Sequence, residues 1–195
     1  MELLKSYSFK NITICPVDEE FAGELLGKED DYLKNLSCFD LQSRLQCEKT
    51  DLKVEDYVCF LTKQVLKWEE QYLNLLLSKA QIASDLFEGY NIKFPSRIYI
   101  VLTNGKDEQR AAYCRGLDVI VIPTNFFNDY FFLKVFIHEC FHIFSRNNLE
   151  LKDKLYEVIG FRRLQKEVKL PECLIRISNP GKLLLIRYKI RLSVL

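Results

Sequence analysis

The sequence predicts an α+β fold: a helical N-terminal region with a long helix, a small β-sheet, and then an apolar helix followed by a second helix. Three observations predict this order. Apolar residues recur at spacings of three to five over residues 54–90, which is helical periodicity. Short runs rich in β-branched residues follow at 97–103 and 111–123. Residues 126–145 are apolar on nearly every side, as in a buried helix.

The first half of the chain is expected to be helical. Residues 17–48 have the pattern of two or three short helices, broken at Gly27 and near Ser37. A single long helix is then expected over residues 54–90, because its apolar residues fall on one face while Lys, Glu and Gln fill the other.

The β-sheet is expected to follow. Residues 97–103 have the composition of a strand, which ends at a turn formed by Asn104 and Gly105. Within 111–123, Arg115 and Gly116 are expected to turn a hairpin whose second arm is fully apolar.

Two helices are expected after the sheet. The buried helix is expected to begin at Asn128 or Asp129. A turn at residues 147–148 separates it from a helix over 149–161, which ends near Gly160.

Composition excludes several classes of protein. The chain has 195 residues, of which 48% are hydrophobic, with 7 Gly and 5 Pro, so it is expected to form a compact core and not a disordered chain. Its net charge of +1 gives no reason to expect a nucleic-acid partner. No apolar run approaches the ~18 residues that span a bilayer. The N-terminus does not resemble a secretory signal, so we expect a cytoplasmic protein without stable membrane insertion, with export as an effector left open. The seven scattered cysteines are expected to be buried thiols in a reducing compartment.

The two histidines of the chain, His138 and His142, are separated by four positions with Glu139 between them, in the pattern HExxH. Residues four apart on a helix share a face, so both imidazoles can bind one Zn²⁺. Glu139 is then placed to take a proton from a zinc-activated water and to pass it to a leaving amine. The competing interpretation is a buried polar cluster without metal, which costs several kcal/mol unless its neighbours provide hydrogen bonds.

With two β units in front of it, this motif resembles that of the zincin metallopeptidases. Residues 112–180 are also similar to uncharacterised bacterial zincin-like peptidases that carry Ser-Arg after the motif, then Leu-Tyr-x-x-Ile-Gly-Phe and a later Asn-Pro. The resemblance implies a zincin-like fold and a zinc-dependent endopeptidase whose edge strand binds the backbone of a protein or peptide substrate. Residues 1–50 are then an N-terminal helical segment, 51–180 the metallopeptidase domain and 181–195 a basic apolar tail.

The resemblance also implies a third zinc ligand, an acidic side chain as in gluzincins or aspzincins, because Ser145 and Asn148 stand where metzincins carry a glycine and a third histidine. If the last two helices form an antiparallel hairpin, Glu157 and Asp153 lie level with the histidines. Glu157 is the preferred ligand. The alternatives are Asp153, Tyr156 and Glu172.

Two questions stay open at the level of sequence. Arg146 and Tyr113 are weaker candidates for stabilising an oxyanion, against a salt bridge and packing as their ordinary roles. The function alternative to a peptidase is a non-catalytic interaction protein on a zincin scaffold, with a structural or lost metal. A third class is membrane-surface binding by the tail.

Overall fold

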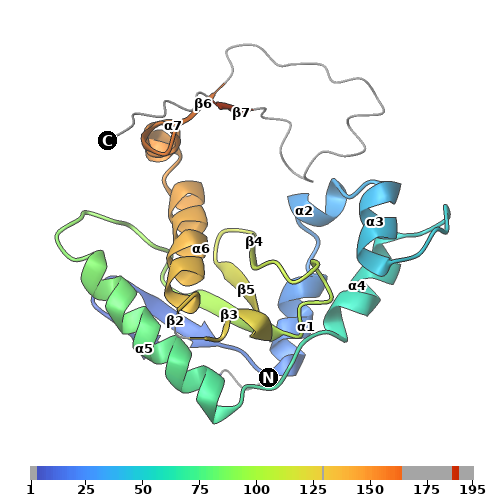
Figure 1. Ribbon diagram of the computed structural model, residues 1–195, viewed down its shortest axis with the longest axis horizontal. Helices are drawn as coiled ribbons and strands as arrows, with labels where there is room; N and C mark the ends of the chain where they lie inside the picture. The colour runs from blue at the N-terminus through green and yellow to red at the C-terminus, as the bar shows by residue number, and fades with distance from the viewer. Residues whose placement is uncertain (1–3, 129, 164–185, 189–195) are drawn as a thin grey trace.

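The computed structural model describes residues 4–128, 130–163 and 186–188, and shows a β-sheet between two layers of helices (Figure 1). The sheet has five strands in the order β1-β2-β3-β5-β4. Their bounds are β1 Tyr7–Ser8, β2 Thr13–Pro16, β3 Ile98–Thr103, β4 Tyr113–Arg115 and β5 Val119–Pro123. The three central strands are parallel, while β1 and β4 are antiparallel to their neighbours and form the two edges. The predicted mixture of helices and a small sheet is therefore confirmed.

The residues of the central strands alternate between two hydrophobic cores. Ile98, Ile100 and Leu102 of β3 face a core shared with α5 (Glu70–Leu86) and α6 (Phe132–Asn147). Val101, between them, faces the opposite core, which is shared with α1 (Glu19–Gly27) and α4 (Val54–Thr62). Because successive side chains of a strand point to opposite faces, a strand that is apolar at every position is covered on both sides.

The N-terminal region agrees with its prediction in its helices and differs from it in its strands. The expected short helices are α1, α2 (Asp31–Lys34) and α3 (Cys38–Leu45), separated near Gly27 and Ser37. Ser37 caps α3 by accepting a hydrogen bond from the backbone N–H of Asp40. The region also contributes β1 and β2, which the sequence analysis did not identify, to the same sheet as β3.

The prediction of a single long helix over residues 54–90 is wrong. The chain forms α4 and α5, and the residues between them run along the end of β3. There the N–H of Leu66 donates to the carbonyl of Leu102 (2.9 Å), and the N–H of Asn104 donates to the carbonyl of Gln64 (2.9 Å). Val65 forms an isolated bridge with Thr103. Backbone groups of this segment thus form hydrogen bonds with the sheet and not within a helix. The helix-like spacing of its apolar residues reflects the burial of their side chains instead.

The predicted hairpin is confirmed as β4 and β5, with Gly116 in the turn at a φ of +53°. The left-handed region at this position favours glycine. The apolar helix is confirmed as α6, but it begins at Phe132 and not at Asn128 or Asp129 as predicted. The side chain of Asn128 accepts a hydrogen bond from the N–H of Phe131 (3.0 Å), just before the helix.

Helix α7 (Leu149–Val158) ends before Gly160 as expected, but it does not form the predicted antiparallel hairpin. Figure 1 shows α7 end-on where α6 is seen from the side, so α7 crosses the end of α6. It contacts α6 through the rings of Tyr156 and Phe141, whose centroids are 5.5 Å apart. The chain then enters β6 (Phe161–Arg163), which pairs with β7 (Ile186–Tyr188), the described part of the predicted tail. None of the described helices is long and apolar enough to cross a membrane.

Candidate metal centre

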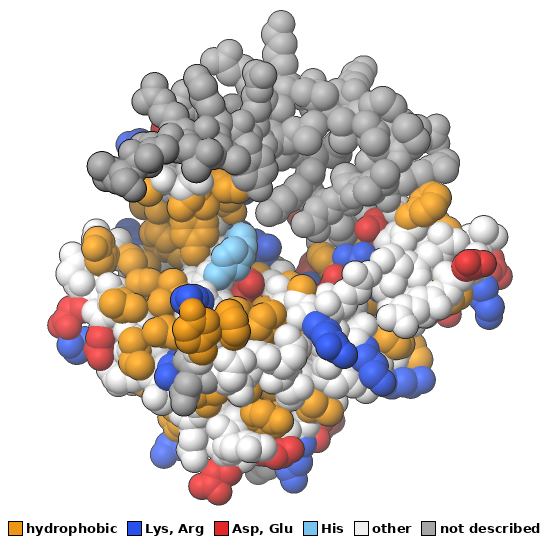
Figure 2. Space-filling view, in the orientation of Figure 1, with side chains coloured by type: hydrophobic (Ala, Val, Ile, Leu, Met, Phe, Trp, Pro, Cys, Tyr) orange, Lys and Arg blue, Asp and Glu red, His pale blue; other side chains and the backbone are white. Residues whose placement is uncertain are grey.

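Helix α6 brings the two histidines together. The Nε2 atoms of His138 and His142 are 3.0 Å apart, and the ring planes are nearly perpendicular. His138 is exposed and His142 is half-buried, so the pair is open to solvent. Figure 2 shows histidine side chains at the surface, beside hydrophobic ones.

The geometry of this pair fits a single divalent metal ion. Neutral imidazole nitrogens are common zinc ligands, and two of them at ~2.0–2.1 Å from one tetrahedral ion lie about 3.3 Å apart. The observed 3.0 Å between the Nε2 atoms is close to that value. The same distance also suits a hydrogen bond between the two rings.

Glu139 lies between the histidines in sequence but turns toward the sheet. It is 4% exposed, and its Oε2 accepts a hydrogen bond from Sγ of Cys114 (3.0 Å) on the edge strand β4. Burial and the negative charge of Glu139 hold the pKa of the Cys114 thiol well above its usual range. The thiol is therefore protonated at neutral pH and is the donor in this bond.

The hairpin and α6 are joined at three further points. Nη1 of Arg146 donates to the carbonyl oxygens of Cys114 (3.2 Å) and Gly116 (3.0 Å). Nδ2 of Asn147 donates to the carbonyl oxygen of Leu117 (2.7 Å). Arg146 therefore binds backbone carbonyls of the edge strand and its turn, while the oxyanion role considered from the sequence stays a prediction. A peptide that paired with β4 at Cys114 would have to replace this contact.

Three of the candidates for the third zinc ligand lie on α7, the helix that follows the histidine pair. Glu157 and Asp153 are exposed on α7, and Tyr156 is half-buried against Phe141. Glu172 lies outside the described residues. Within residues 4–128, 130–163 and 186–188, no group of three or more His, Cys, Asp or Glu side chains is placed to hold a metal ion.

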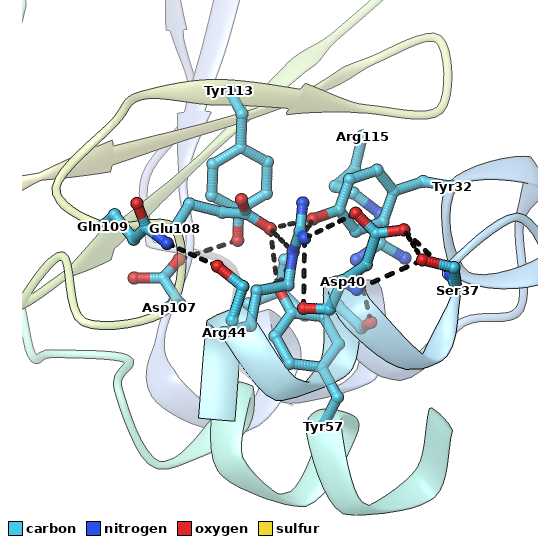
Figure 3. A network of polar contacts seen from close by, with 12 residues as sticks. Tyr32, Ser37, Asp40, Arg44, Tyr57, Asp107, Glu108, Gln109, Tyr113 and Arg115 are labelled. Atoms are coloured by element: carbon cyan, nitrogen blue, oxygen red, sulfur yellow. Dashed lines mark hydrogen bonds and ion pairs between the residues drawn. The ribbon is translucent and has the colours of Figure 1, made fainter. Parts of the chain in front are cut away.

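Tyr113 faces the other side of the sheet from Cys114, as alternation along β4 requires. Its hydroxyl donates to Oδ2 of Asp107 (2.8 Å) and so belongs to a polar network around α2, α3 and α4 (Figure 3). At its centre, Oε1 of Glu108 accepts hydrogen bonds from Arg44 Nε (2.7 Å) and the Tyr57 hydroxyl (2.8 Å), and it also contacts the hydroxyl of Tyr32. Burial raises the pKa of Glu108 to about 8, against the lowering effect of the Arg115 charge.

Arg115, also on β4, completes this network. Its guanidinium binds both carboxylate oxygens of Asp30 (2.8 and 3.0 Å) and lies over the ring of Tyr32. The edge strand is therefore fixed on both faces, by α6 on one and by the N-terminal helices on the other.

Sequence reasoning did not assign a role to Cys114 or to this network. Cys114 was one of seven cysteines expected to be packing residues, and the signal available was its position between Tyr113 and Arg115 on a predicted strand. Six cysteines are described, and all are free thiols, of which Cys15, Cys114 and Cys140 are buried. Comparison of the chain with protein-family models, with curated proteins and with solved structures finds no significant match.

Proposed function

We propose that the chain is a zinc-dependent peptidase whose metal is held by His138 and His142. The observation that carries the proposal is the pair of Nε2 atoms 3.0 Å apart on the open side of α6, with Glu139 between them in sequence. An edge strand beside this helix is also what the resemblance to zincins implies, and β4 is an edge of the described sheet.

When bound, Zn²⁺ acts as a Lewis acid that lowers the pKa of a water molecule and polarises a carbonyl group. The residues of the chain supply the rest. His138 and His142 would hold the ion through the lone pairs of their Nε2 atoms. The carboxylate of Glu139 accepts the proton of the attacking water and transfers it to the amine that leaves.

A third ligand completes the site in this proposal. Glu157 is the first residue to test, since α7 contacts α6 directly through Tyr156. Glu172 is the second. Each is a carboxylate, and a carboxylate oxygen is a known zinc ligand together with two histidines in peptidases.

The test is hydrolysis of a quenched-fluorescence peptide library by the wild type and by Glu139→Gln, each at measured zinc content. The amide keeps the size of the side chain but accepts no proton, so we expect a loss of about 10²- to 10⁴-fold in rate with zinc retained. Glu150→Gln, an exposed glutamate in the first turn of α7, is the matched control. Wild-type turnover by Glu139→Gln, or a wild type that cleaves no peptide with zinc bound, would contradict the proposal.

A further inference from the structure

The carboxylate of Glu139 is held by a group from another element. Sγ of Cys114 lies 3.0 Å from Oε2 of Glu139 and 3.4 Å from its backbone carbonyl oxygen. Cys114 is 7% exposed and Glu139 is 4% exposed, so water competes weakly for this contact. Hydrogen bonds to a buried charged group are stronger than neutral ones.

The donor is itself fixed in place. Arg146 binds the backbone carbonyl of Cys114. Arg115, the next residue of β4, binds Asp30 on the opposite face of the sheet. The thiol therefore approaches Glu139 from a strand that is hydrogen-bonded to α6 and to the N-terminal helices. A rigid donor restricts the rotamers that the acceptor can adopt.

We propose that Cys114 is a positioning residue for Glu139, whose carboxylate it orients by donating its S–H to Oε2. The catalytic consequence rests on the proposed function above, whereas the hydrogen bond does not. With the bond in place, the carboxylate has one fixed direction from which to accept a proton. Without it, Glu139 loses a buried donor and samples other rotamers, so fewer molecules are ready to react.

Packing alone is the competing role for Cys114, because a buried thiol also behaves as a small hydrophobic group. Three variants separate the two roles. Cys114→Ala removes the donor, Cys114→Ser keeps a donor, and Cys140→Ala removes another fully buried thiol, which packs in the hydrophobic core from the same helix as Glu139.

The first measurement is infrared absorption by the S–H bond, which stretches in a region free of other protein bands. The difference between the wild type and Cys114→Ala isolates the Cys114 band. We expect this band at a lower frequency in the wild type than in a Glu139→Gln background, because a carboxylate is a stronger acceptor than an amide. A band at the same frequency in both backgrounds overturns the proposal.

The second measurement is peptide hydrolysis at matched zinc content. We expect Cys114→Ala to lower kcat/KM by about 10- to 100-fold, with rescue by Cys114→Ser, and Cys140→Ala to lower it by less. Equal activity of Cys114→Ala and the wild type overturns the positioning role even if the band is shifted. A wild type that cleaves no peptide overturns the proposed function instead, and the infrared shift still decides the hydrogen bond.

Discussion

Replacement of Arg115 by methionine tests how the edge strand is held. The Arg115 side chain is 2% exposed and binds Asp30, whose own side chain is 22% exposed. It also donates to the carbonyl oxygens of Leu26 and Lys28 (both 3.3 Å). Methionine fills much of the same volume, so the free energy of unfolding falls mainly because the polar contacts of Arg115 are removed.

Removal of one partner from a buried ion pair costs about 3–5 kcal/mol, because the other charge stays buried and unpaired. Partial exposure of Asp30 places the expected cost at the lower end, about 3 kcal/mol. The assay is equilibrium unfolding in urea at neutral pH, read as the free energy of unfolding. The double variant Arg115→Met with Asp30→Asn is expected to recover part of the loss, since no charge then lies unpaired.

The matched control is Lys10→Met, which removes one partner of the exposed Lys10–Glu88 pair (2.7 Å). We expect it to leave the free energy of unfolding unchanged within error. A loss below about 1 kcal/mol for Arg115→Met would refute the reasoning that this pair anchors β4.

Two further predictions concern the third ligand and the polar network. Glu157→Ala is expected to lower zinc affinity by more than the ~10- to 100-fold typical of residues that only orient a ligand, whereas the effect of Asp153→Ala stays within that range. Competition against a chelator measures both affinities. The reverse order of effects would assign the ligand to Asp153. The pKa of Glu108 is about 8 in the folded chain against an ordinary value of 4.5, so the protonated form favours folding. Stability is therefore expected to fall as pH rises through 8. The free energy of unfolding should differ less between about pH 6 and about pH 9 in Glu108→Gln than in the wild type. An unchanged pH dependence in that variant would show that another group titrates.

Local signals in the sequence predicted the elements around the candidate site well. The hairpin of β4 and β5 follows from the glycine at position 116 and a fully apolar second arm. The placement of His138 and His142 on one helix face follows from their spacing alone, because a helix fixes which residues are neighbours.

The errors arose where distant parts of the chain decide the structure. Residues between α4 and α5 were predicted as helix, but they pair with β3 through the carbonyl of Leu102, a contact that no local pattern encodes. Where α7 crosses α6, Tyr156 packs on Phe141, a contact that the length of the turn does not encode. Glu108 likewise meets Arg44 and Tyr57, which are contributed by two other elements.

The central claim is that His138 and His142 bind zinc, and elemental analysis of the purified protein tests it most directly. We expect about one zinc ion per chain in the wild type and a large loss in His142→Ala, because a single imidazole then remains in the pair. Lys134→Ala, an exposed residue on the same helix, is the control and is expected to keep its zinc. A folded wild type that carries no zinc and is unchanged when zinc is added would contradict the account.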